Sequence, residues 1–152
     1  MAGNFEKLID PFGRHIEDLR ISVTDRCNFR CTYCMPVEGM QWLDRSAVIS
    51  FEEIEHLPRI FVERYCFQGI RLTGGEPTVR AHLSVLVEML SKLRGPNGPI
   101  DLSMTTNGAT MRLVAPKLKA AGLKRVNISL DTLEREKFFQ MTRRDELDKV
   151  LD

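Results

Sequence analysis

Short strand-like runs alternate along the chain with stretches in which apolar residues recur at helical spacing. Residues 19–24 alternate apolar and polar side chains, which is typical of a β-strand. Residues 70–73, 101–106 and 125–130 are further short runs bounded by turn residues, and they predict three more strands. A helical pattern follows every one of these runs. The sequence therefore predicts strands joined by helices.

The helices in the first two thirds of the chain have start and stop signals. Ser50 and Glu53 have the spacing of a capping box for a helix that begins at Phe51, and Pro58 is expected to end or kink that helix. A later helix is expected to stop at Gly95, which is followed by proline. Its apolar residues recur at helical spacing at Leu83, Leu86, Val87, Leu90 and Leu93.

The last third of the chain predicts two more helices and the beginning of another. A helix over roughly residues 113–121 stops at Gly122, with Pro116 as an expected irregularity. Thr132 is expected to cap the next helix. Residues 147–152 begin an amphipathic helix that has neither a cap nor a glycine stop. This pattern predicts that the chain is a fragment of a longer protein.

This order of elements predicts an α/β fold. Strands that alternate with helices form a parallel sheet with helical crossovers. Four such units are too few to close an eight-stranded barrel. The length favours one domain over residues 1–152, so we expect part of a (β/α) barrel.

Composition and charge narrow the class of protein. The 152 residues are 43% hydrophobic and 28% charged, as in an ordinary globular domain, and the net charge is +1. This balance argues against a broad nucleic-acid or membrane surface. No apolar run approaches the roughly 18 residues of a membrane-spanning helix, and residues 1–10 lack the apolar stretch of a secretory signal. The sequence thus predicts a cytoplasmic protein without nucleic-acid or membrane partners.

Three cysteines lie within eight residues, at Cys27, Cys31 and Cys34. A disulfide needs two cysteines, whereas closed zinc sites and ferredoxin-type clusters normally take four ligands. Three thiolates on a 4Fe–4S cluster leave one iron free for an external chelator, and the amino and carboxylate groups of S-adenosylmethionine (SAM) suit that iron. Zinc remains an alternative, with Cys66 or His15 as its fourth ligand.

These motifs resemble known enzymes. The spacing Cys-x-x-x-Cys-x-x-Cys, with an aromatic residue before the last cysteine, resembles the radical SAM superfamily, and the run Gly-Gly-Glu-Pro at residues 74–77 resembles its second motif. Longer runs resemble the GTP 3′,8-cyclase family of molybdenum-cofactor biosynthesis in the same order along the chain: residues 12–14, 19–36, 71–77, 105–108 and 127–131.

The resemblance implies a role for nine residues. Three would bind the 4Fe–4S cluster: Cys27, Cys31 and Cys34. Three would contact SAM: Tyr33, Gly75 and Ser129. Three would contact GTP: Arg20, Arg71 and Thr105. In this family a 5′-deoxyadenosyl radical takes hydrogen from C3′ of GTP, and the carbon radical attacks C8 to give 3′,8-cyclo-7,8-dihydro-GTP.

The resemblance also implies partners and missing parts. An electron donor such as a flavodoxin or ferredoxin would reduce the cluster, and a homodimer is compatible with the family. The family has a C-terminal extension with a second 4Fe–4S cluster and a Gly-Gly tail, and this chain has neither. The sequence is therefore expected to be the N-terminal portion of the radical SAM core, and inactive alone.

Other interpretations remain open for the chain and for its site residues. The chain could belong to a peptide-modifying or heme-pathway branch of the superfamily, or could be a zinc-binding module without catalysis. Tyr33 could pack against the fold, and Gly75 could serve only a tight turn. Exposed arginines, and Ser or Thr residues that cap helices, are common without any ligand. The role of Glu76 is left open.

Overall fold

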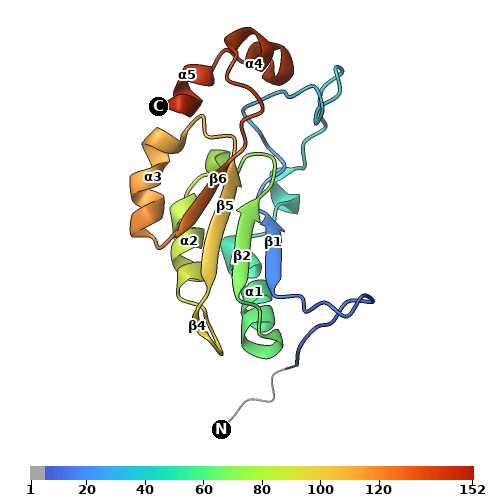
Figure 1. Ribbon diagram of the computed structural model, residues 1–152, viewed down its shortest axis with the longest axis vertical. Helices are drawn as coiled ribbons and strands as arrows, with labels where there is room; N and C mark the ends of the chain where they lie inside the picture. Colours follow the sequence, from blue (N-terminus) through green and yellow to red (C-terminus); the bar gives the residue numbers. More distant parts are fainter. Residues whose placement is uncertain (1–5) are drawn as a thin grey trace.

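The computed structural model describes residues 6–152 (Figure 1). The sequence analysis found no secretory signal in residues 1–10, and residues 1–5 of that segment lie outside the described residues. Its centre is a four-stranded parallel sheet, to which a two-stranded hairpin is added. The strands of the sheet are β1 (Asp18–Ser22), β2 (Gly69–Thr73), β5 (Asp101–Thr106) and β6 (Arg125–Ile128). The hairpin pairs β3 (Arg94–Gly95) with β4 (Gly98–Pro99).

Helices connect the strands of the sheet and follow the last one. The α-helices are α1 (Phe51–Tyr65), α2 (Leu83–Ser91), α3 (Met111–Ala120), α4 (Arg135–Thr142) and α5 (Leu147–Leu151). Two short 3₁₀ helices, η1 (Arg45–Ala47) and η2 (Pro77–Val79), lie in the connections. None of the helices of residues 6–152 combines the length and apolar character needed to cross a membrane.

The strand order in the sheet is β1-β2-β5-β6, and every neighbouring pair is parallel. Each strand of the sheet therefore pairs with the sheet strand before it along the chain, and a helix makes each crossover. This confirms the α/β class and the parallel sheet. The sequence did not predict the β3–β4 hairpin at the glycine and proline residues after α2.

Two local predictions at the helices differ from the structure. Pro58 does not end α1, which continues to Tyr65. Pro116 lies within α3, inside the helix that was expected there. Thr132 does not cap α4: the N-cap is Glu134, and the Thr132 hydroxyl instead accepts a bond from the Glu134 N–H at 3.1 Å. A serine or threonine can bond the backbone two residues on, so its sequence position alone does not fix where the helix begins.

The capping box at Ser50 is confirmed. The Ser50 hydroxyl accepts from the Glu53 N–H at 3.1 Å, and the Glu53 carboxylate accepts from the Ser50 N–H at 2.7 Å. Replacing Ser50 with alanine is expected to lower the free energy of unfolding by about 1 kcal/mol, because the helix loses a cap. Urea unfolding at pH 7 measures the difference, and equal stabilities would contradict a contribution from the cap.

The same box has a pH dependence. The Ser50 N–H that donates to the Glu53 carboxylate holds the pKa of Glu53 below its usual value. A lowered folded-state pKa stabilises the fold above the unfolded pKa, near 4.5, and this stabilisation is lost as the pH falls through the lowered value. The stability gap between wild type and a Glu53→Ala variant, which lacks this carboxylate, is therefore expected to narrow as the pH falls below 4.5.

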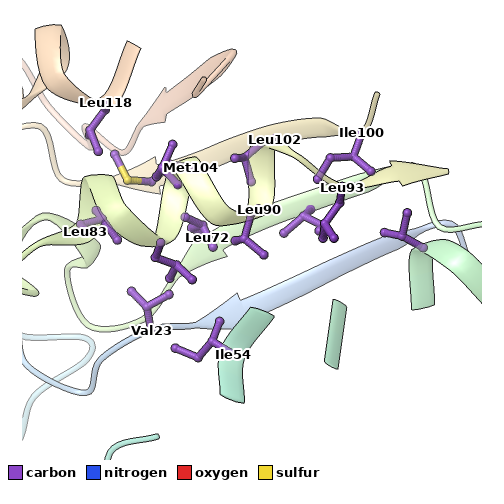
Figure 2. Packing of buried hydrophobic residues seen from close by; sticks show 14 of the residues in the cluster. Val23, Ile54, Leu72, Leu83, Leu90, Leu93, Ile100, Leu102, Met104 and Leu118 are labelled. Carbon is purple, nitrogen blue, oxygen red and sulfur yellow. The ribbon is translucent and has the colours of Figure 1, made fainter. Parts of the chain in front are cut away.

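One face of the sheet is apolar and forms the main core with α1, α2 and α3. Alternate residues of each strand point to this face, among them Leu72, Leu102 and Met104, which are fully buried. Figure 2 shows Leu83 and Leu90 of α2 packed against them, with Ile54 of α1 beside Val23. The apolar positions that predicted these elements are thus the ones that join helices to sheet.

The opposite face of the sheet is polar. It carries the remaining alternate residues of the strands, among them Arg20, Arg71 and Thr105. Figure 1 shows α1 and α2 behind the sheet, while none of the described helices lies over the polar face. Every residue of β6, including Val126 and Ile128, is exposed. The sheet therefore presents an open polar face and an open edge.

Candidate cofactor site

The cysteines lie in a loop that follows β1 and reaches back to α4. The Arg30 N–H donates to the Thr142 carbonyl at 3.0 Å, and the Thr32 N–H donates to the Met141 carbonyl at 2.8 Å. Phe29 packs edge-on against Phe138, with the ring centroids 5.7 Å apart. These contacts hold the loop at the end of the sheet where the strands finish, beside α4 and α5 (Figure 1).

The three loop cysteines are free thiols with different exposure. Cys31 is 8% exposed, Cys27 is half-buried and Cys34 is exposed. Burial raises the pKa of the Cys27 and Cys31 thiols, so both hold their protons at neutral pH. Among residues 6–152, no three His, Cys, Asp or Glu side chains are arranged to hold a metal ion. Binding of a metal group requires these thiols to lose their protons, because the thiolate is the ligand.

Gly74 and Gly75 fit tightly beneath the cysteine loop. Gly74 has a φ of +143°, and a Cβ on it would lie 2.4 Å from the Thr24 carbonyl oxygen. A Cβ on Gly75 would lie 2.4 Å from the carbonyl oxygens of Asp25 and Arg26. The Gly75 N–H donates to the Thr24 carbonyl at 2.7 Å. Glycine is thus needed here because two backbones approach closely.

Glu76 is a buried carboxylate, 1% exposed, that joins two strand ends. Its Oε1 accepts from the Thr78 N–H at 3.1 Å, from the Thr78 hydroxyl at 2.6 Å and from the Thr106 hydroxyl at 2.6 Å. Its Oε2 accepts from the Asn107 N–H at 2.7 Å. The structure therefore gives Glu76 a role that the sequence left open: it ties the loop after β2 to the loop after β5.

Asn107 brings this network to the first cysteine. Its side-chain amide nitrogen lies 2.8 Å from Asn28 Oδ1 and 3.9 Å from Cys27 Sγ. The Phe29 N–H also donates to Cys27 Sγ, at 3.4 Å. Sequence reasoning included Asn107 in the family-like run of residues 105–108 but gave it no role. The available signal was its place directly after a strand, on the edge of the sheet where ligands of α/β folds bind.

Tyr33 lies in the cysteine loop, and Ser129 follows β6 two residues before the hydrogen-bond partner of Tyr33. Tyr33 is 63% exposed and donates its hydroxyl to Asp131 Oδ2 at 2.8 Å, across 98 positions of sequence. Partial burial and the Asp131 carboxylate raise the pKa of the Tyr33 phenol, so the hydroxyl keeps its proton. Ser129 follows β6, is exposed, and donates its N–H to the Thr106 carbonyl at 2.9 Å. Tyr33 is thus not packed into the core, and Asp131 is its unforeseen partner.

The two arginines of the polar face are direct neighbours. Arg20 of β1 and Arg71 of β2 occupy the same register position, and such strands lie about 4.8 Å apart. In the described part of the chain no carboxylate forms an ion pair with either one. Adjacent like charges repel, so this pair costs stability unless an anion joins it. Thr105 lies two residues beyond the register level of the arginines.

The fourth cysteine lies far from the other three. Cys66 caps the end of α1, just before β2 begins, and His15 pairs with Ile9 just before β1 begins. The cysteine loop lies beyond the opposite ends of these parallel strands. A strand of five residues spans about 16 Å. Neither Cys66 nor His15 can therefore be the fourth ligand of a zinc held by the cysteine loop, and that alternative is wrong.

This open parallel sheet, with three cysteines beyond the end of its first strand and a double glycine beyond the second, defines a class of protein. The chain belongs to the radical SAM superfamily, whose description it matches over residues 21–152. It is 50% identical over 145 residues to a GTP 3′,8-cyclase of Rhodopirellula baltica, covering 95% of this chain and 40% of that protein. A GTP 3′,8-cyclase of Paenarthrobacter nicotinovorans is 48% identical over 150 residues, with 99% and 41% covered.

Solved structures share the fold. The crystal structure of Streptococcus suis SuiB bound to S-adenosylmethionine has a TM-score of 0.64 with this chain at 19% sequence identity. The match covers 88% of this chain and 29% of SuiB. SuiB bound to its precursor peptide SuiA has a TM-score of 0.65 at 21% identity. The chain thus spans less than half the length of the relatives and solved proteins that it matches.

The family implies a 4Fe–4S cluster and SAM as cofactors, and the residues present fit them. Three thiols stand in one loop, none is held in a disulfide, and thiolates are the ligands that bind iron–sulfur clusters. Gly75 lets the backbone of the second motif pack directly against the loop that carries the cysteines, with no side chain between them. Cys66 is remote from the loop, so within the described chain it cannot form a disulfide with any of these three cysteines.

Proposed function

We propose that residues 1–152 form the N-terminal portion of the radical SAM core of a GTP 3′,8-cyclase, which converts GTP to 3′,8-cyclo-7,8-dihydro-GTP. The observation that carries the proposal is the juxtaposition of Arg20 and Arg71, which form no ion pair within residues 6–152, on the polar face of a sheet whose strand ends bear the cysteine loop. A triphosphate would supply the negatively charged partner that these two arginines lack. Identity near 50% to GTP 3′,8-cyclases over nearly the whole chain supports the same substrate.

In this proposal Cys27, Cys31 and Cys34 hold three irons of the cluster. When bound, the cluster and SAM supply one-electron cleavage of a carbon–sulfur bond and a radical that abstracts hydrogen. The chain fixes the position of this chemistry. The cysteine loop is anchored to α4 by backbone bonds and to the second motif through Gly75 and Glu76.

Tyr33, Gly75 and Ser129 are proposed to contact SAM. All three lie at the strand ends around the cysteine loop, on segments that follow β1, β2 and β6. The exposed Tyr33 ring is oriented by its bond to Asp131, so it presents a fixed apolar surface. No hydrogen bond among the described residues engages the Ser129 hydroxyl, so it can donate to a ribose or a carboxylate, while its backbone N–H is bonded to the Thr106 carbonyl.

Arg20, Arg71 and Thr105 are proposed to contact GTP from the polar face. Guanidinium groups bind phosphate oxygens through paired donors, and they stay charged at all working pH values. Because Arg20 and Arg71 repel each other without an anion, binding GTP also relieves a cost within the chain. An electron donor such as a flavodoxin or ferredoxin, a homodimer and a cytoplasmic location stay predictions for the complete gene product.

Replacing Arg71 with alanine is expected to weaken GTP binding at least tenfold, about 1.4 kcal/mol, because a charge-assisted contact to the triphosphate is lost. Equilibrium dialysis with the complete gene product measures the dissociation constant. Arg20→Ala is expected to act in the same direction.

Arg64→Ala is the matched control. It removes the same charge from an exposed side chain on α1, behind the sheet, and should leave GTP affinity unchanged. Wild-type protein that binds no GTP, or an R71A variant that binds as tightly as wild type, would favour another branch of the radical SAM superfamily.

A further inference from the structure

Among the hydrogen bonds of residues 6–152, one side chain outside the cysteine loop contacts a sulfur of that loop, and it belongs to Asn107. Its Nδ2 lies 3.9 Å from Cys27 Sγ, a long contact for a sulfur acceptor, and 2.8 Å from Asn28 Oδ1. An amide nitrogen carries two hydrogens, so it can serve both acceptors at once. Asn107 follows β5, 80 positions beyond Cys27.

The orientation of the Asn107 amide is set by its other contacts. The Ala109 N–H donates to Asn107 Oδ1 at 3.1 Å, so the oxygen end faces the start of α3. Asn28 Oδ1 accepts on the other side, which requires the NH₂ end there. An amide flipped by 180° would place oxygen against oxygen and N–H against N–H. The donor end of Asn107 must therefore face Cys27.

The backbone that carries this amide is anchored as well. The Asn107 N–H donates to Glu76 Oε2 at 2.7 Å, and Glu76 is held by Thr78 and Thr106. The Glu76 N–H donates in turn to the Arg26 carbonyl at 2.8 Å, one residue before Cys27. Cys27 is thus approached from two directions by one buried network. Asn107 is set in place before any cofactor binds.

We propose that Asn107 is a positioning residue for Cys27, and that its amide N–H, directed at the Cys27 sulfur, raises the reduction potential of the cluster. This inference rests on the proposed cluster ligands. A hydrogen bond to a ligating sulfur withdraws negative charge from it and so favours the reduced, more negative cluster. Asn107 itself touches neither SAM nor GTP in this role; it acts through the thiolate.

Asn107→Asp tests the inference with almost no change in shape. The carboxylate keeps the acceptor for the Ala109 N–H but loses the donor and adds negative charge beside Cys27. We expect the midpoint potential of the cluster to fall. At a fixed solution potential the ratio of reduced to oxidised cluster should be at least tenfold lower, which corresponds to a fall of about 59 mV for a one-electron couple. Redox titration of the complete gene product, monitored by electron paramagnetic resonance, measures the midpoint potential. The signal that changes when SAM is added identifies the cluster held by the cysteine loop.

Three comparisons distinguish a direct effect of the Asn107 donor on the reduction potential from a structural disruption of the cysteine loop. Asn97→Asp makes the same change at an exposed turn between β3 and β4 and should leave the potential unchanged. Asn107→Ala should lower the potential without adding charge, which covers the case in which the aspartate variant does not fold. Asn28→Ala breaks the same 2.8 Å bond but leaves the Asn107 donor, so its potential should not fall below that of wild type.

The outcomes distinguish this inference from the proposed function. Wild-type protein without an iron–sulfur cluster would overturn both. A cluster of normal iron content whose potential is the same in wild type, N107D and N107A would overturn the role of Asn107 and leave the proposed function standing. Equal falls in N107A and N28A would also overturn it, since they would indicate disruption of the loop and not loss of the donor.

Discussion

In protein consisting of residues 1–152, which carries only one of the family's two clusters, serine at Cys27, Cys31 or Cys34 is expected to abolish the visible iron–sulfur absorbance after anaerobic reconstitution with iron and sulfide. Three sulfurs are the fewest that can hold three corners of a cubane, so the loss of one leaves two protein ligands. A serine hydroxyl is a poor replacement because it stays protonated at neutral pH, whereas cluster ligands must be anionic. Bound iron is expected to fall from about four per cluster toward zero.

Cys66→Ser is the matched control for these variants. The substitution is the same, but Cys66 lies at the end of α1, remote from the cysteine loop. It should retain the full absorbance and iron content of wild type. A colourless wild-type protein that holds one zinc per chain would refute the cluster, and a C66S variant that loses its iron would refute the assignment of ligands.

Alanine at Gly75 is expected to lower the free energy of unfolding and to weaken SAM binding. Its Cβ would lie 2.4 Å from two carbonyl oxygens, those of Asp25 and Arg26, and backbone atoms cannot rotate out of the way. Overpacking of this kind costs about 1–3 kcal/mol, and the two bonds that join the loops, from the N–H groups of Gly75 and Glu76, would lengthen as well. Urea unfolding should show the loss of stability, and SAM binding at equilibrium should weaken with it.

Gly95→Ala provides the comparison. An added Cβ at Gly95 meets its nearest atom, the Phe67 carbonyl oxygen, at 3.4 Å, which is an ordinary contact. Gly95→Ala should therefore unfold at nearly the same urea concentration as wild type. If G75A were as stable as G95A and bound SAM equally well, the two loops would not be packed as closely as the structure has them.

The sheet could be predicted because its strands have local signals. The alternation of apolar and polar residues at β1 and at β2 buries one face of each strand against helices, so the pattern and the packing have the same cause. The β3–β4 hairpin was missed because two-residue strands are too short to show a period. Pro58 was misjudged because its sequence position does not say whether tertiary packing keeps a helix together, and Pro58 is buried in α1.

The site was predictable in its parts and not in its connections. The cysteine spacing and the double glycine are local, so they can be read from neighbouring residues. The partners Asn107 of Cys27 and Asp131 of Tyr33 lie 80 and 98 positions away, and only the strand register brings them together. Glu76 could not be interpreted because its carboxylate is satisfied by backbone and hydroxyl donors, which leave no charge pattern in the sequence.

The backbone anchors of the cysteine loop have a consequence for biosynthesis. Arg30 and Thr32 donate to carbonyls of residues that the ribosome adds more than 100 codons later. At about 5–20 residues per second, the nascent loop waits roughly 5–20 s for these acceptors. Its thiols are exposed to oxidants in that interval. Delivery of iron and sulfide in the cell is therefore expected to follow translation of α4, with protection of the nascent thiols as a separate requirement.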